Sequence, residues 1–241
     1  MIDLHCHILP GVDDGAADLQ EALLMARMAR DSGTRTLVAT PHSGFGDVWI
    51  SPETIRDSAD RLQHLARQEG LALSILPGME LLCTRQLPQI LQNKQYLTLA
   101  DSRYLLTEFF FDEDPASMNR MLEMVAEHGL TPIIAHPERY DAVQHDPYLV
   151  EYWMEQGYGI QINSGSLLGT LGRGAQMAGK WLVHNSLAHV VASDGHSMEI
   201  RTARLRAVRE YLEDHVSVSC AQALLFDNPR LVLQDRPLPR Y

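Results

Sequence analysis

Short apolar runs alternate with amphipathic stretches along the chain, and this alternation limits the fold more strongly than any other feature. The apolar runs predict strands at residues 1–5, 35–42, 71–80, 102–111, 131–140, 158–165 and 188–196. The stretches between and after them predict helices near residues 18–33, 52–70, 85–94, 116–129, 146–157, 173–185, 200–215 and 221–228. Several runs lack polar alternation, as parallel strands covered on both faces do. Successive βα units favour a parallel α/β barrel over a doubly wound sheet, and we expect residues 1–241 to form one domain.

Composition and charge restrict the class of function. The net charge is −11 and the isoelectric point about 5.4, so we expect no nucleic-acid binding. The cysteines, Cys6, Cys83 and Cys220, are too few and scattered for a disulfide framework, which favours a reducing compartment. The first residues show no leader pattern, and no apolar run is long enough for a membrane span. We therefore expect a cytoplasmic protein that does not insert into a membrane.

Ionisable side chains occur at or just beyond the ends of most predicted strands. In a parallel barrel these ends meet on one rim, where active sites lie. Two pairs are spaced by two residues, so the members of each pair point to the same face of a strand. The set comprises His5, His7, Asp14, His42, Glu80, Glu108, His136, Asp194 and His196. Such groups are costly at the ends of apolar strands unless they are paired or bind metal, and the set therefore predicts a metal site.

The types of ligand indicate what such a site does. Imidazoles suit zinc, manganese and iron, whereas carboxylates can bridge ions and suit manganese or magnesium. A mixed set without a cysteine ligand indicates a hydrolytic cluster rather than structural zinc. Cys6 lies between two predicted ligands and should point away from them. Asp3 and Asp13 are interpreted as structural residues or as groups that orient a ligand imidazole.

Two arginines near the predicted rim indicate an anionic substrate. Arg139 lies on the loop beyond the fifth strand, and Arg201 follows the seventh. A guanidinium group matches phosphate oxygens, although an isolated arginine more often forms a surface ion pair. The cysteine-phosphatase motif is absent, because Val12, Gln89 and Phe226 stand where its arginine would follow a cysteine. The sequence also lacks a P-loop and a G-x-S-x-G motif.

Together these motifs resemble those of the polymerase-and-histidinol-phosphatase (PHP) superfamily. The matching segments are H-C-H followed by Asp14, T-P-H ending at His42, L-P-G-M-E ending at Glu80, H-P-E-R around His136 and S-D-G-H around Asp194. Within the superfamily, the whole chain is similar to bacterial protein-tyrosine phosphatases of capsule and exopolysaccharide loci. The resemblance implies a distorted (β/α)7 TIM-like barrel of PHP type that holds two or three divalent ions. Manganese is favoured, and iron, zinc and magnesium are alternatives.

The same resemblance implies a role for each residue. The first ion would be held by His5, His7, Glu80 and Asp194. The second would be held by Glu80, Glu108 and His136, and the third by Asp14, His42 and His196. The phosphate would contact Arg139 and Arg201. We also consider His42 and His196 as catalytic groups that assist the reaction.

The implied activity is hydrolysis of phosphotyrosine on a cognate membrane-associated tyrosine kinase that regulates polysaccharide synthesis. One alternative is a phosphatase of the same superfamily that acts on histidinol phosphate or another small phosphomonoester. An amidohydrolase-type metal barrel fits less well, because Asp14 and Glu108 are present and no lysine lies at a strand end. A non-enzymatic kinase-binding module would have no use for the complete ligand set. The oligomeric state stays open.

Overall fold

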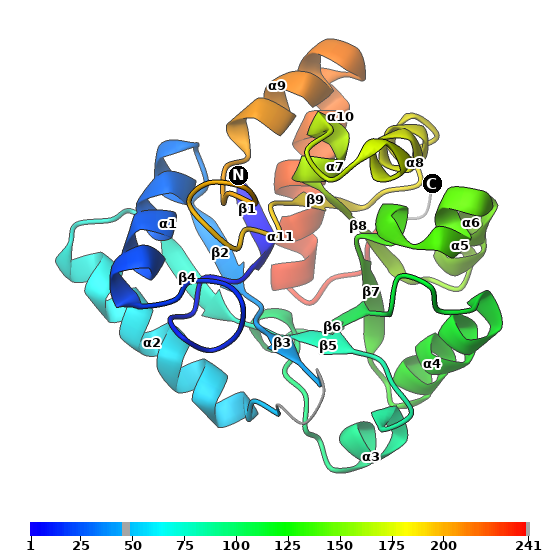
Figure 1. Ribbon diagram of the computed structural model, residues 1–241, viewed down its shortest axis with the longest axis horizontal. Helices are drawn as coiled ribbons and strands as arrows, with labels where there is room; N and C mark the ends of the chain where they lie inside the picture. Colours follow the sequence, from blue (N-terminus) through cyan, green and yellow to red (C-terminus); the bar gives the residue numbers. More distant parts are fainter. Residues whose placement is uncertain (45–48, 240–241) are drawn as a thin grey trace.

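The computed structural model describes residues 1–44 and 49–239, and within these ranges every pair of strands is parallel. The strands are β1 (Ile2–Cys6), β2 (Thr36–Ala39), β3 (His42–Ser43), β4 (Ser74–Pro77), β5 (Glu80–Leu82), β6 (Tyr104–Glu108), β7 (Thr131–Ala135), β8 (Gly159–Asn163) and β9 (Val190–Ala192). One sheet has the strand order β1-β2-β4, and the other has the strand order β3-β5-β6-β7-β8-β9. The strands lie around the centre and helices surround them (Figure 1), which confirms the predicted parallel α/β fold.

Two of the predicted strands are each divided into two segments. The run 35–42 becomes β2 and β3, and the run 71–80 becomes β4 and the start of β5. Pro41 has no N–H group to donate to a ladder. At Gly78, a Cβ atom would lie 2.7 Å from Val38 Cγ1, so only glycine allows this approach. As a result, β2 pairs with β1 and β4 in one sheet, whereas β5 pairs with β3 and β6 in the other.

The ring of strands closes between β1 and β9 without a regular ladder, and we call this junction the β1–β9 seam. Cys6 and Gly195 form an isolated parallel bridge. The N–H of His7 donates to the carbonyl oxygen of Gly195 over 2.8 Å, and the N–H of Asp194 donates to the carbonyl oxygen of His5 over 2.9 Å. The architecture is therefore a barrel-like ring with an interrupted seam rather than one closed sheet.

Helices surround the ring of strands, most of them on its outside and α11 at one end. They are α1 (Leu19–Asp31), α2 (Pro52–Gln68), α3 (Leu87–Gln92), α4 (Pro115–Glu127), α5 (Asp141–His145), α6 (Tyr148–Glu155), α7 (Ser164–Leu168), α8 (Arg173–His184), α9 (Arg206–His215), α10 (Val218–Gln222) and α11 (Asn228–Leu233). The side chains of Asp18, Ser51 and Asp114 cap the first turns of α1, α2 and α4. No helix among the described residues is long and apolar enough to cross a membrane.

The helix predicted at residues 200–215 is shorter than expected, because α9 begins only at Arg206. The carbonyl oxygen of Arg201 accepts N–H groups of His196 at 2.7 Å and Ser197 at 3.0 Å, which is incompatible with a helix through this segment. The chain folds back closely, since a Cβ atom on Gly195 would lie 2.9 Å from Ala203 Cα. This turn keeps Arg201 beside the end of β9.

Two apolar clusters hold the ring together. The larger cluster fills the layer between strands and helices and includes Met25, Leu62, Leu122 and Leu182. The smaller cluster includes Leu4, Val38, Leu106, Ile133, Val190 and Val232 of α11. Each fully buried side chain of this size stabilises the fold by roughly 1.5–3 kcal/mol. Because α11 and Leu238 pack on the smaller cluster, the C-terminal segment closes one end of the ring.

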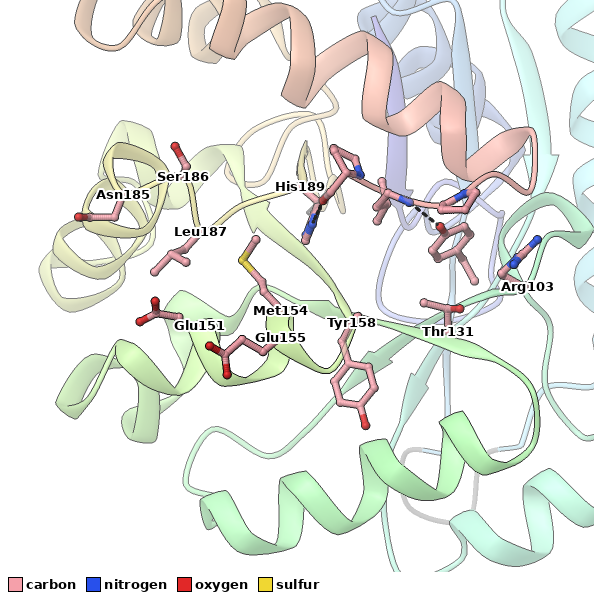
Figure 2. A pocket seen from close by; sticks show the side chains of 15 residues that line it. Arg103, Thr131, Glu151, Met154, Glu155, Tyr158, Asn185, Ser186, Leu187 and His189 are labelled. Carbon is pink, nitrogen blue, oxygen red and sulfur yellow. Dashed lines mark hydrogen bonds between the residues drawn. The ribbon is translucent and has the colours of Figure 1, made fainter. Parts of the chain in front are cut away.

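A cavity of about 800 Å³ lies beside this closure, at the N-terminal ends of β6 to β9 (Figure 2). Residues 237–239 form one wall. The hydroxyl of Tyr104 accepts the N–H of Leu238 at 3.1 Å. His189 Nδ1 accepts the N–H of Ile160 at 3.2 Å, so His189 Nε2 donates to the carbonyl oxygen of Pro239 at 3.1 Å. None of the described residues that line the cavity is a predicted ligand, and the cavity is opposite the rim that carries the ligands.

Candidate metal centre

All nine predicted ligands converge on one rim of the ring. They lie on β1, β3, β5 and β6 or on the segments that follow β1, β7 and β9, and Asp14 lies on the loop between β1 and α1. His5, His7 and Glu80 are fully buried. The side chain of Asp14 is 62% exposed and therefore marks the solvent side of the cluster. Strand ends that are far apart in sequence thus present nitrogen and oxygen atoms to one another, as predicted.

The first group of potential ligands consists of His5, His7, Glu80 and Asp194. Glu80 Oε2 lies 3.0 Å from His5 Nε2 and 3.2 Å from His7 Nε2. Asp194 Oδ1 lies 3.4 Å from each of these nitrogens. One potential ligand atom from each residue lies within 4.8 Å of the others, so together they could hold one ion. The composition is the one that the family resemblance implied.

The second group centres on Glu80 and Glu108. His136 Nε2 lies 2.9 Å from Glu80 Oε1 and 3.8 Å from Glu108 Oε2. His42 Nδ1 lies 3.1 Å from Glu80 Oε2 and 2.8 Å from Glu108 Oε1. His42 therefore faces this group as well as the third group, to which the resemblance alone assigned it.

The third group brings Asp14 together with His42 and His196. Asp14 Oδ1 lies 3.6 Å from His42 Nε2 and 3.4 Å from His196 Nε2. His7 also lies within reach of this group, and its ring stacks on that of His196 with 3.7 Å between the centroids. The three groups share residues, so the arrangement suits a compact cluster of ions better than separate mononuclear sites.

Unsatisfied buried atoms test whether the donor set fits metal ions. Among residues 1–44 and 49–239, Glu80 Oε2, Glu108 Oε1 and His196 Nε2 are buried and form no hydrogen bond of suitable geometry, although each lies within 3.4 Å of a nitrogen or oxygen atom of another residue in the cluster. A buried polar atom without a partner costs about 1–3 kcal/mol. These atoms point into the groups described above, and imidazole nitrogen with carboxylate oxygen is a donor set for divalent ions. The residues present therefore fit a metal cluster.

The charges of the cluster are mutually dependent. Burial disfavours protonated His5, but Glu80 and Asp194 outweigh it and raise the pKa of His5 to about 9. Burial would also raise the pKa of Glu80, but His5 and His42 hold the pKa of this carboxyl well below its ordinary range. The pKa of Asp194 is well below its usual value because His5 and His7 overcome the effect of burial. The carboxylates are thus ionised, as metal ligands must be.

The backbone is strained at two of the converging residues. His136 has φ of 37° and Asp194 has φ of 50°, in the left-handed region that side chains other than glycine rarely adopt. Such a conformation costs on the order of 1–3 kcal/mol and persists where the surrounding structure imposes it. His136 directly follows β7 and Asp194 lies two residues after the end of β9, and the left-handed turn redirects each side chain onto the rim.

Supporting residues fix the orientation of the histidines, and of these residues only Asp13 was expected from the sequence. Asp13 Oδ2 accepts the Nδ1–H of His7 at 2.7 Å, a contact that agrees with the expected role of orienting an imidazole. Gln161 Oε1 accepts the Nδ1–H of His5 at 2.8 Å, and Gln161 Nε2 donates to Asn163 Oδ1 at 2.8 Å. The amide groups of β8 were missed, although two amides within the apolar segment G-I-Q-I-N were a visible signal.

A second missed contribution comes from Asn163 and Glu138. Asn163 Nδ2 donates to Asp194 Oδ2 at 2.6 Å. Glu138 is fully buried, and its Oε1 accepts the N–H of Asn163 and the hydroxyl of Ser166.

The thiol of Cys6 is buried on the outer side of β1, and burial raises its pKa well above the usual value, so it is not a nucleophile.

Arg139 and Arg201 approach the cluster from two loops. Arg139 Nη1 lies 3.4 Å and Arg201 Nη1 3.3 Å from Asp194 Oδ2. Arg201 Nη2 also lies 3.6 Å from Asp14 Oδ2. Their side chains are 20% and 25% exposed, so both remain accessible at the mouth of the cluster. Two guanidinium groups beside clustered donor atoms form a site that can bind a phosphoryl group.

Comparison with known proteins agrees with this geometry. A model of the family described as capsular polysaccharide synthesis, CpsB/CapC, matches residues 1–234. The chain belongs to the CpsB/CapC family. The tyrosine-protein phosphatase YwqE of Bacillus subtilis is 37% identical over 240 residues, which cover 100% of this chain and 94% of that protein. The tyrosine-protein phosphatase CpsB of Streptococcus pneumoniae is 30% identical over 241 residues, which cover 98% and 99%.

Solved structures place this CpsB/CapC family member in the same fold. A structure from the work on YwqE of Bacillus subtilis and CpsB of Streptococcus pneumoniae, described as unique metal-dependent tyrosine phosphatases, superposes with a TM-score of 0.93. It is 36% identical, and the match covers 100% of this chain and 97% of that one. A D-hydantoinase and a dihydropyrimidinase superpose with TM-scores of 0.52 and 0.58 at 12% and 11% identity, which shows a common fold only.

Proposed function

We propose that residues 1–241 form a single metal-dependent protein-tyrosine phosphatase domain. The observation that carries the proposal is the approach of Arg139 and Arg201 to Asp194 Oδ2 at 3.4 and 3.3 Å, at the mouth of the cluster of metal-type donors. A site that combines clustered cations with guanidinium groups binds and activates a phosphate ester. The similarity to tyrosine phosphatases along the entire chain supports phosphotyrosine as the substrate.

The proposed metal ligands follow the three groups of contacts. One ion would be held by His5, His7, Glu80 and Asp194, a second by Glu80, Glu108 and His136 with His42 nearby, and a third by Asp14, His42 and His196. Manganese is the favoured ion, with iron, zinc and magnesium as alternatives, because the set mixes imidazoles and carboxylates. When bound, such ions lower the pKa of water and neutralise charge on the phosphoryl oxygens.

The protein groups supply binding, orientation and proton transfer. Arg139 and Arg201 would exchange part of their contact with Asp194 for the phosphoryl oxygens, which accept two parallel hydrogen bonds from a guanidinium group. His42 and His196 are the candidate groups for moving a proton near the leaving oxygen. A tyrosine phenolate has a pKa of about 10 and leaves without a strong acid, so the arginines should matter more than either histidine.

The proposed substrate is phosphotyrosine on a cognate membrane-associated tyrosine kinase that controls polysaccharide synthesis. The family description, capsular polysaccharide synthesis, supports this partner. An enzyme that acts on the intracellular part of such a kinase would work in the cytoplasm. This setting agrees with the free thiols of the three cysteines, because a protein without disulfides requires no oxidising compartment.

Hydrolysis assays test the proposal. We expect chelator-treated protein to be inactive, and protein reloaded with Mn²⁺ to release phosphate from a phosphotyrosine peptide faster than from a phosphoserine peptide or from histidinol phosphate. Glu80→Gln should lose metal and activity together, since Glu80 contacts four imidazoles of the cluster. Preference for histidinol phosphate would overturn the substrate, and a fully active, metal-loaded Glu80→Gln would contradict the central role of Glu80.

A pair of arginine variants separates phosphate binding from general charge. We expect Arg201→Lys to lower kcat/KM by about tenfold or more, because lysine cannot form the two-pronged contact. The matched control is Arg103→Lys at the opposite end of the ring, where Arg103 pairs with Asp235. This exposed pair should contribute little, and the control should change kcat/KM by less than about twofold. Equal effects of the two variants would argue against a phosphate site at Arg201.

A further inference from the structure

Three phenylalanines directly follow Glu108 at the end of β6, and they differ in their surroundings. Phe109 is buried, with its ring at 77° to that of Tyr140 and 5.9 Å between the centroids. Phe110 and Phe111 are 47% and 46% exposed. A single exposed phenyl ring is common on protein surfaces and needs no explanation. The exposure of Phe111 does need an explanation, because other groups of the candidate site hold its ring in place.

The ring of Phe111 packs against the loop that follows β7. The guanidinium carbon of Arg139 lies 4.5 Å from the centroid of the Phe111 ring. The rings of His136 and Tyr140 each lie 6.2 Å from it, centroid to centroid. The carbonyl oxygen of Phe111 also accepts the N–H of Asp141 at 2.9 Å. Both the ring and the backbone of Phe111 are therefore fixed relative to Arg139.

Arg139 connects Phe111 to the cluster. Its Nη1 lies 3.4 Å from Asp194 Oδ2, while the Phe111 ring covers the guanidinium group at 4.5 Å. Such a cation–π contact restricts the side-chain rotamers of an arginine that would otherwise be mobile. A phosphate bound by Arg139 would thus have its ester oxygen close to a phenyl ring that is nearly half exposed.

We propose that Phe111 determines specificity by offering its exposed face to the aromatic ring of an aryl phosphate, and that it also positions Arg139. This inference rests on the proposed function and defines its substrate class more closely. Offset and edge-to-face aromatic pairs favour an aryl over an alkyl substituent. Their usual strength corresponds to about three- to tenfold in affinity. A seryl or imidazole-alkyl phosphate would gain less from this contact.

Phosphonates test the proposal without turnover. The dissociation constants of phenylphosphonate and methylphosphonate are measured by calorimetry with Mn²⁺-loaded full-length protein. We expect the wild-type protein to prefer phenylphosphonate, and Phe111→Leu to reduce this preference by about three- to tenfold. Leucine keeps apolar volume at residue 111 while removing the aromatic face. Phe111→Tyr keeps an aromatic ring and should retain the preference for phenylphosphonate.

Phe110→Leu is the matched control, because Phe110 has the same exposure and lies on the same segment. It should leave the ratio of the two dissociation constants within about twofold of the wild-type ratio. An unchanged ratio in Phe111→Leu, or an equal loss in Phe110→Leu, would overturn the proposed role of Phe111. Hydrolysis of a phosphotyrosine peptide by the wild-type protein is measured in parallel. A lack of hydrolysis would overturn the proposed function, whereas the phosphonate ratio reports on Phe111 independently.

Discussion

Asp13 offers a sharp test of how the protein supports the candidate metal centre, and Asp13→Asn is the informative change. Asp13 Oδ2 accepts the Nδ1–H of His7 at 2.7 Å and the N–H of His42 at 2.9 Å. Asp13 Oδ1 accepts the N–H of Gly15 at 3.0 Å. Asparagine has one acceptor oxygen in place of two. It can therefore satisfy the two histidine donors or Gly15, but not all three.

The expected magnitude follows from these contacts. Removing a residue that orients a ligand imidazole typically lowers metal affinity by about 10- to 100-fold. That range corresponds to about 1.4–2.7 kcal/mol. The N–H of Gly15 would face an amide donor, which adds about 1–3 kcal/mol of destabilisation of the fold. Because His7 lies in two of the three ligand groups, we expect more than one ion to bind more weakly.

Competition with a fluorescent chelator measures the change in Mn²⁺ affinity, and urea denaturation measures the change in stability. The control is Asp18→Asn on the same loop, where the side chain caps α1 by accepting the N–H of Glu21 at 2.9 Å. Asparagine also caps helices, so this control should change affinity by less than about twofold. Equal affinities of the Asp13 and Asp18 variants would refute the supporting role of Asp13.

Further predictions concern pH, packing and metal. Burial lowers the pKa of His189 to about 4, so between about pH 6.5 and pH 4 the unfolded state binds a proton that the folded state does not. As the pH falls over that range, the unfolding free energy of the wild-type protein should decrease by up to about 3 kcal/mol, and that of His189→Gln should decrease less. Urea denaturation midpoints measure both; an equal dependence on pH in the two proteins would contradict a contribution from His189. Gly15→Ala would place a Cβ atom 2.0 Å from the carbonyl oxygen of His7, and calorimetry should show a loss of about 1–3 kcal/mol. Metal at 1,000 times its dissociation constant should add about 4 kcal/mol to the unfolding free energy; a melting temperature unaffected by chelator would argue against a bound cluster.

Two features could be predicted from the sequence because they depend on local spacing. These are the alternation of strands and helices and the set of candidate ligands. His5 and His7 share a face as the strand period requires, and Cys6 points to the outer layer. Parallel strands bring their C-terminal ends together whatever the details of the ring. Chemistry placed at those ends could therefore be recognised before the partners of each strand were known.

The supporting residues were harder to foresee because their role depends on distant partners. Gln161 contacts His5, 156 positions away in the chain, and nothing near Gln161 in sequence names that partner. The division of the second strand depends on how β2 and β3 pair, and Pro41 alone does not reveal it. The late start of α9 depends on backbone hydrogen bonds to Arg201, although residues 200–205 have an ordinary helical composition.

The β1–β9 seam has a consequence for the order in which the protein is assembled during synthesis. Cys6 and Gly195 are 189 positions apart, so one edge of β1 stays unpaired until the chain has been made beyond Gly195. Contacts of such long range form slowly because the intervening loop has to close first. The proposed ligands His5 and Asp194 lie on opposite sides of this junction. If these residues hold the first proposed ion, an incomplete chain cannot bind it, and activity would become possible only after the last strand has docked.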